Sequence, residues 1–250
     1  MRFESIQEII EKQPKLVLAA GHKECFEPSG NVKTLIKKNL NSKELQFYSE
    51  NCEDTSIFRG VIPIVYSISA KERRVELENI TYGMKHPIVI DIKIGTHYFT
   101  GIHQARGPGF LKSMPTKLLT DYADIIYGAR KMGWKVQGCS WLKSLDRKGI
   151  HSKKNLNDFM KKINLNPDQI RSIYAQLENM RRTLEKCNYG FIRSSILMAA
   201  DCNGEPIVKL IDFSNAFKFK NEAQKQKSPY SKGSITGIEN LKKVFLQKLK

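Results

Sequence analysis

The sequence predicts an α+β protein that is rich in strands first and rich in helices later. Short runs of β-branched residues bounded by Gly, Pro and Asn dominate residues 16–95, whereas apolar residues recur at helical spacing after residue 118. A chain of 250 residues can form two modest lobes. We place their boundary near residues 82–86, which gives an N-terminal lobe of residues 1–82, a C-terminal lobe of residues 83–250 and a cleft between them.

A helix and four strands are expected before residue 86. The capping box Ser5-x-x-Glu8 predicts the helix, because its side chains satisfy backbone N–H groups at the helix start. Aliphatic and β-branched runs separated by turn residues predict the strands. These strands cover residues 16–20, 32–38, 61–68 and 73–80.

The stretch HPIVIDIKIGTH, residues 86–97, predicts a strand with two different faces. One face is apolar and the other carries an acid and a base two residues apart. On charge spacing alone, a solvated ion pair is the favoured interpretation of that acid and base. Because side chains alternate along a strand, the two faces hold Ile88, Ile90, Ile92 and Ile94, and Val89, Asp91, Lys93 and Gly95, respectively.

Helical spacing dominates the later part of the chain. Residues 101–117 mix Gly, Pro and basic residues and are expected to form an irregular connection. A longer helix is expected after the cap Asn166, with Pro167 in its first turn and Gly190 after its end. The other expected helices cover residues 118–129, 156–163 and 238–249.

Three strands and a loop complete the expected elements. A strand is expected at residues 134–141, and residues 191–200 and 206–213 are expected to pair as a hairpin. Asp212 ends the second hairpin strand, where a lone Asp is more often a turn residue than a magnesium ligand. Residues 217–232 are polar and basic and are expected to form a loop.

The charge balance indicates polyanionic partners. Lys and Arg number 42 against 25 Asp and Glu, a net charge of +17, which would oppose folding by self-repulsion unless anions are common partners. Nucleic acid, an anionic membrane surface and a multiply phosphorylated small molecule all fit. Five scattered cysteines and the lack of a signal-peptide or membrane-spanning run favour the cytoplasm or nucleus. We also expect a monomer.

Common phosphate-binding and zinc motifs are absent from the sequence. It contains no G-x-x-x-x-G-K-[ST], no G-x-G-x-x-G and no H-R-D catalytic loop, which argues against a P-loop enzyme and an ordinary protein kinase. The five histidines lack zinc-protease spacing.

Six short segments, in order, resemble the inositol polyphosphate kinase family. The strand at residues 87–95 matches its Pro-x-x-x-Asp-x-Lys-x-Gly signature. Single motifs of this length arise by chance, but six in the correct order do not. The other segments are KKNLNSKELQFY (37–48), LENITYGMKHP (77–87), SSIL (194–197), LIDFSN (210–215) and GIENLKKVF (237–245).

This resemblance implies a two-lobed, kinase-like ATP-binding fold with antiparallel sheets in both lobes and a cleft between them. It implies ATP and Mg²⁺ as cofactors and inositol polyphosphates as partners, with no nucleic acid. Lys38 would hold the ATP phosphates, because the spacing to Glu44, Phe47 and Tyr48 favours it over the adjacent Lys37.

The remaining roles on the ATP side also follow from the resemblance. The backbone of Glu78 and Ile80 would bind adenine, and Asp91 would bind ribose, with general base as its second role. Lys93 would bridge the γ-phosphate and the inositol phosphate. Asp212 would hold Mg²⁺, supported by Ser195.

The substrate side departs from the family pattern at several positions. Residues 146–149 replace a Lys-x-x-Gly turn, His97 replaces an Arg, and an Asn replaces the His after the Asp-Phe segment. A solvated basic loop stays an equal alternative for the basic candidates. The residues expected to contact substrate are Lys93, Arg106, Lys112, Lys117, Arg147, Lys148 and Asn215.

The resemblance is strongest to a short inositol hexakisphosphate kinase, because residues 77–96 look most like that branch. Such an enzyme makes a diphosphoinositol pentakisphosphate, an inositol pyrophosphate. A multikinase or trisphosphate kinase, which phosphorylates a ring hydroxyl, is the alternative. An alternative of another class is a basic nucleic-acid-binding module, although its cations are not interleaved with aromatic residues.

Overall fold

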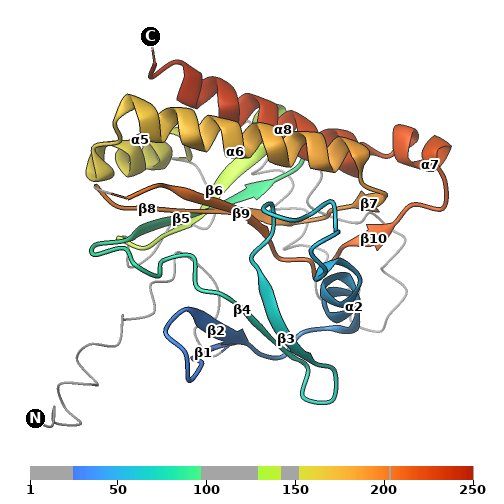
Figure 1. Ribbon diagram of the computed structural model, residues 1–250. Helices are drawn as coiled ribbons and strands as arrows, with labels where there is room; N and C mark the ends of the chain where they lie inside the picture. Colours follow the sequence, from blue (N-terminus) through green and yellow to red (C-terminus); the bar gives the residue numbers. More distant parts are fainter. Residues whose placement is uncertain (1–24, 97–128, 142–151, 203, 250) are drawn as a thin grey trace, which may run out of the picture.

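Two four-stranded antiparallel sheets form the framework of the described residues, one on each side of residue 82 in the sequence (Figure 1). The computed structural model describes residues 25–96, 129–141, 152–202 and 204–249. The α+β class and the antiparallel sheets predicted from the sequence are confirmed.

The N-terminal sheet has the strand order β1-β2-β4-β3. Its strands are β1 (Phe26–Pro28), β2 (Thr34–Lys37), β3 (Val65–Ser69) and β4 (Arg74–Glu78). The short β1 was not predicted, because it has only three residues and ends in Pro. A helix, α2 (Ser42–Asn51), follows β2 and begins at the cap Asn41, whose side chain accepts a hydrogen bond from the Glu44 N–H.

The C-terminal sheet has the strand order β6-β5-β8-β9. The predicted strand of residues 86–97 is observed as β5 (Ile88–Ile94), at the centre between β6 (Trp134–Cys139) and β8 (Ser195–Ala200). The predicted hairpin is also confirmed, since β8 pairs with β9 (Ile207–Ile211).

Helices α5 (Ser152–Ile163), α6 (Pro167–Lys186) and α8 (Pro229–Leu246) cover one face of the C-terminal sheet (Figure 1). The apolar face predicted for β5 packs beneath them, and Ile90, Ile92 and Ile94 are almost fully buried. The long helix begins as the sequence predicts: Asn166 and Gln169 form a reciprocal capping box, and Pro167 occupies the first turn. A short helix, α4 (Ala129–Met132), precedes β6.

The prediction of a loop at residues 217–232 is wrong. This segment contains β10 (Phe217–Lys218), which pairs with β7 (Tyr189–Gly190), then α7 (Glu222–Lys227) and the start of α8. Polar composition concealed two helix caps, because the side chains of Asn221 and Ser228 accept hydrogen bonds from backbone N–H groups at the starts of α7 and α8.

Helix α8 approaches the end of β5 through glycines. A Cβ added to Gly237 would lie 2.0 Å from the Gly133 carbonyl oxygen, and one added to Gly233 would lie 2.4 Å from the Thr96 hydroxyl. The Gly95 N–H donates to the same Gly133 carbonyl at 2.8 Å. Because Gly233 and Gly237 have no side chain, the backbone of α8 can contact Thr96 and Gly133 closely, next to the turn that follows β5.

Several predicted elements lie outside the described residues. They are the helix at residues 5–8, the strand at 16–20, the connection at 101–117 and nearly all of the helix at 118–129. Among the helices that the structure describes, none has a long enough apolar run to cross a membrane.

Candidate active site

The face of the C-terminal sheet opposite the helices carries the charged residues of the β5 signature, and we call it the site face. Three cross-strand rows on β5, β8 and β9 make up this face. The rows are Val89–Ala199–Ile207, Asp91–Leu197–Lys209 and Lys93–Ser195–Ile211. The first row is entirely apolar, and the charged and hydroxyl side chains lie in the two rows nearer to Asp212, which follows β9.

Asp212 turns its carboxylate to this face because of an unusual backbone conformation. Its φ is 65°, in the left-handed region that Asp and Asn tolerate better than most residues. The turn sends Phe213 into the core, where its ring stacks on Phe47 with centroids 3.9 Å apart. The Ser194 hydroxyl donates a hydrogen bond to the Asp212 carbonyl oxygen at 2.8 Å, which stabilises the turn.

Two lysines from different sheets meet at the Asp212 carboxylate. Lys93 Nζ lies 2.6 Å from Oδ2, and Lys37 Nζ lies 3.5 Å from Oδ1. Lys37 Nζ is also 2.7 Å from Glu44 Oε1 on α2. The side chain of Asp212 is 35% exposed, so the carboxylate stays open to a ligand.

The structure brings Lys37, and not the favoured Lys38, to this cluster. Lys37 shares a strand face with Leu35, which packs on the core, and its side chain is 15% exposed. Lys38 follows it in sequence, is 36% exposed and pairs with Glu27 at 2.8 Å. Spacing along the sequence could not decide between neighbours, because the face that meets the second sheet depends on how the two sheets pack.

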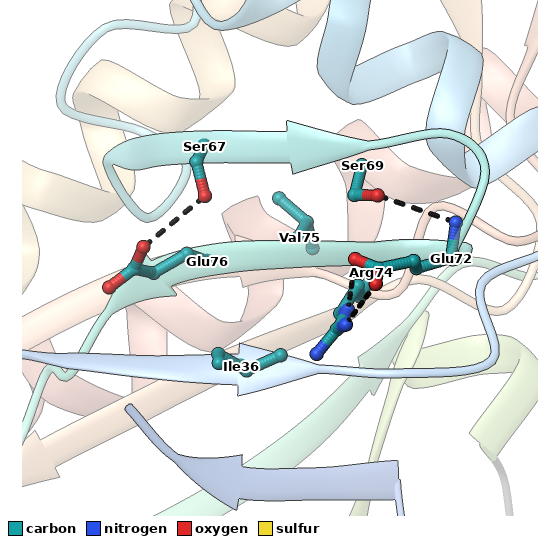
Figure 2. Close-up of a pocket in the computed structure, with 7 residues that line it drawn as sticks. All are labelled: Ile36, Ser67, Ser69, Glu72, Arg74, Val75 and Glu76. Carbon is teal, nitrogen blue, oxygen red and sulfur yellow. Dashed lines mark hydrogen bonds and ion pairs between the residues drawn. The ribbon is translucent and has the colours of Figure 1, made fainter. Parts of the chain in front are cut away.

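The opposite face of the N-terminal sheet has a hollow of about 180 Å³ (Figure 2). Its polar groups are already paired: Ser67 donates to Glu76 at 3.2 Å, and the Arg74 Nε donates to Glu72 at 2.7 Å. Ile36 alternates with Lys37 along β2, so this hollow lies on the far side of the sheet from Asp212.

Two buried oxygens on the site face lack a hydrogen-bond partner of good geometry among the described residues. They are Asp91 Oδ1 and Ser195 Oγ, although the Ser195 hydroxyl lies near enough to Asp91 to oppose the rise of its pKa. Asp91 is 6% exposed, and burial raises its pKa to about 6, although the nearby Lys93 ammonium opposes that rise. An unpaired buried oxygen is costly, so both atoms are suited to a bound cation or hydroxyl group.

Charges in the cluster shift one another's protonation. Burial acts to raise the pKa of Asp212, but Lys93 and Lys37 outweigh it and hold that pKa below its ordinary value. Burial acts to lower the pKa of Lys37, but Glu44 and Asp212 outweigh it and the pKa is raised. Burial, with Glu44 and Asp212, raises the pKa of Tyr48 well above its usual value and keeps the phenol protonated.

The donor set fits a magnesium ion that is shared with phosphates. No group of three or more His, Cys, Asp or Glu side chains in the described residues forms a complete metal cage. Mg²⁺ needs no such cage, since it commonly takes one or two carboxylates and completes its shell with phosphate and water oxygens. Asp212 could supply one ligand, and the unpaired oxygens of Asp91 and Ser195 lie on the same face.

An apolar cluster covers the other end of the site face. Ile80, Val89 and Ala199 are buried together, and Met84, Leu197 and Ile207 pack against them. The cluster joins the segment after β4 to the site face, where adenine was expected. The Glu78 N–H already donates to the Ile64 carbonyl at 2.8 Å, so that donor is engaged in the N-terminal sheet.

The expected substrate contacts are only partly described. Arg106, Lys112, Lys117, Arg147 and Lys148 lie outside the described residues. Asn215 is described, and its side-chain amide donates to the Ser214 hydroxyl at 3.4 Å.

Sequence reasoning missed the contributions of Ser194, Tyr48 and Lys209. Ser194 stood beside the chosen Ser195, and Tyr48 was used only for spacing. The sequence held one usable signal for Lys209: it lies two residues from both Ile207 and Ile211 on a strand, so it shares their face.

The chain was compared with known families and structures. A family model described as inositol polyphosphate kinase matches residues 74–246. The solved structure of inositol phosphate multikinase Ipk2 from S. cerevisiae, in complex with ADP and Mn²⁺, has a TM-score of 0.64 and 15% identity, covering 87% of this chain and 99% of that one. A second inositol phosphate multikinase structure has a TM-score of 0.59 and 17% identity, covering 84% and 100%. No curated protein gives a significant match.

Proposed function

The chain belongs to the inositol polyphosphate kinase family, and from this membership we propose that it transfers the γ-phosphoryl group of Mg²⁺-ATP to an inositol polyphosphate. The observation that carries the proposal is the meeting of Lys37 and Lys93 at Asp212. Phosphoryl transfer needs little covalent chemistry from a protein. It needs cations around the transferring group and a carboxylate for the metal, held in place before the reaction.

ATP would lie along the site face from the apolar cluster to Asp212. The adenine ring would pack on Ile80, Val89 and Ala199, with backbone groups of Glu78 and Ile80 at its edge. The phosphates would then reach Lys37 and Lys93. The similar Ipk2 structure, which holds ADP and Mn²⁺, supports a nucleotide and a divalent metal here.

Asp212 would hold the metal, with Asp91 and Ser195 close by on the same face. When bound, Mg²⁺ would neutralise charge on the phosphates and orient them. The chain's own lysines would do the rest. Lys37 enters from the N-terminal sheet and would bind the phosphates, and Lys93 enters from β5 and would contact both the γ-phosphate and the acceptor.

Inositol hexakisphosphate is the substrate that we propose. The resemblance of residues 77–96 to the hexakisphosphate branch and the net charge of +17 support it. Every hydroxyl of that substrate is already esterified, so the attacking atom is a phosphate oxygen that is ionised near neutral pH. Such a nucleophile hardly needs a general base.

Asp91 favours a second candidate, phosphorylation of a ring hydroxyl as in a multikinase. A hydroxyl nucleophile gains from a nearby base, and a buried carboxylate with a pKa of about 6 is suited to that role near neutral pH. The two similar solved structures are also of inositol phosphate multikinases.

One experiment tests the activity and separates the two substrates. Purified protein is incubated with Mg²⁺-ATP and inositol phosphates from trisphosphate to hexakisphosphate, and products are resolved by anion-exchange chromatography. We expect conversion of hexakisphosphate to a more charged product, and loss of turnover in Lys93→Ala and Asp212→Asn. Turnover of only the less phosphorylated substrates would favour the multikinase, and no turnover of any would contradict the proposal.

A further inference from the structure

Lys209 places a mostly buried ammonium group on the site face, away from Asp212. It lies on β9 in the same row as Leu197 and Asp91, and its side chain is 11% exposed. Its Nζ is 3.3 Å from Glu78 Oε2 and 3.4 Å from the Gly60 carbonyl oxygen. The proposed phosphoryl transfer does not involve this lysine.

These contacts join three segments that are distant in sequence. Glu78 ends β4, and its carboxylate also accepts a hydrogen bond from the Ile64 N–H at 3.2 Å. One residue beyond Lys209, the Leu210 N–H donates to the Val61 carbonyl at 2.8 Å. Strand β9, the segment before β3 and the end of β4 are therefore tied at one point.

Stability alone gives a weak reason for a lysine at this position. Removing an ammonium group from water is costly, and an apolar side chain in place of a buried ion pair is often neutral or stabilising. The neighbours Leu197 and Ile207 would accept such a side chain. An apolar residue could not form a directed bond to Glu78 at the end of β4, two residues before Ile80 of the apolar cluster.

We propose that Lys209 is a positioning residue that holds residues 78–80 at the distance from β9 that the nucleotide base requires. This inference rests on the proposed function, because it assigns Lys209 to the base end of the same ATP site. Lys209 acts through Glu78 and does not touch the phosphates. Its loss should therefore weaken ATP binding and leave the acceptor site unaffected.

The test compares Lys209→Met and Glu78→Gln, which remove the pair, with Lys209→Arg, which keeps the charge. Lys161→Met, at an exposed position on α5, is the matched control. Calorimetry measures the Kd of a non-hydrolysable ATP analogue with Mg²⁺, and steady-state kinetics give kcat and the KM of each substrate. Thermal melting shows whether each variant folds.

We expect Lys209→Met and Glu78→Gln to raise the Kd and the KM for ATP about tenfold, since small misplacements at a binding site have large effects. The KM for the inositol phosphate should not change, and Lys209→Arg should restore most of the affinity. If the wild type binds the analogue and folded Lys209→Met and Glu78→Gln bind it equally well, the inference is wrong and the proposed function stands. If the wild type binds no analogue, both are overturned.

Discussion

Lys93 and Asp212 form a 2.6 Å ion pair between residues that are 119 positions apart in the sequence. Lys37 contacts the other carboxylate oxygen. Asp212, the residue proposed for metal binding, is therefore paired with the two lysines proposed for phosphate binding.

Metal and nucleotide should consequently bind together. A metal ion alone must displace two ammonium groups from Asp212, whereas bound phosphates would draw both lysines away. We expect the Kd of Mn²⁺ to fall about tenfold or more when ADP is present, within the usual range of coupling between two sites. Titration followed by electron paramagnetic resonance measures this directly, and equal affinities with and without ADP would contradict it.

The neighbouring lysines of β2 should differ sharply in importance. Lys37→Met removes a cation from the phosphate side and should lower kcat/KM by about 100-fold, the usual size of a lost charge-stabilising contact. Lys38→Met is the matched control, because Lys38 is on the other face beside Glu27, and its kcat/KM should stay within about twofold of wild type. The reverse order in steady-state assays would restore Lys38 as the phosphate ligand.

Asp91 should make stability depend on pH. Its pKa rises from 3.8 to about 6 on folding, so the unfolded chain releases this proton more easily. The raised pKa therefore adds stability to the folded state that is fully present below about pH 3.8. This contribution is lost as the pH rises through 6. Relative to wild type, Asp91→Asn should gain about 2.5 kcal/mol of unfolding free energy between pH 4 and pH 7.5. Urea melts with a chelator at both values test this, and a pH-independent difference would refute it.

The contact between α8 and the turn after β5 should be sensitive to one methyl group. Gly237→Ala would place a carbon 2.0 Å from a backbone oxygen that cannot easily move. We expect a loss of about 3 kcal/mol or more in unfolding free energy. Gly30→Ala, with nothing within 4 Å of its added carbon, should change stability by no more than about 0.5 kcal/mol in the same denaturation experiment.

Local signals predicted much of the fold. The two faces of β5 and the capped start of α6 follow from alternation and capping, which act between residues close in sequence. The segment 217–232 was mistaken for a loop because its short helices are polar and depend on single caps. Composition alone does not show such caps.

The site was predictable only in part, because its geometry is not local. The Asp91 and Lys93 pair could be placed on one face, and the family resemblance linked it to Asp212. The choice of Lys37 over Lys38 required the packing of two sheets, and the Lys209–Glu78 pair joins strands 131 positions apart in the sequence (209 − 78).

The left-handed backbone at Asp212 restricts which inactive variants can be interpreted. At a φ of 65°, a β-branched or bulky residue would force the chain out of its turn, pull on Phe213 and disturb the core together with the chemistry. Asparagine accepts the same conformation and removes only the charge. Asp212→Asn is thus the variant whose effects in a living cell would report on lost phosphotransfer and not on a damaged fold.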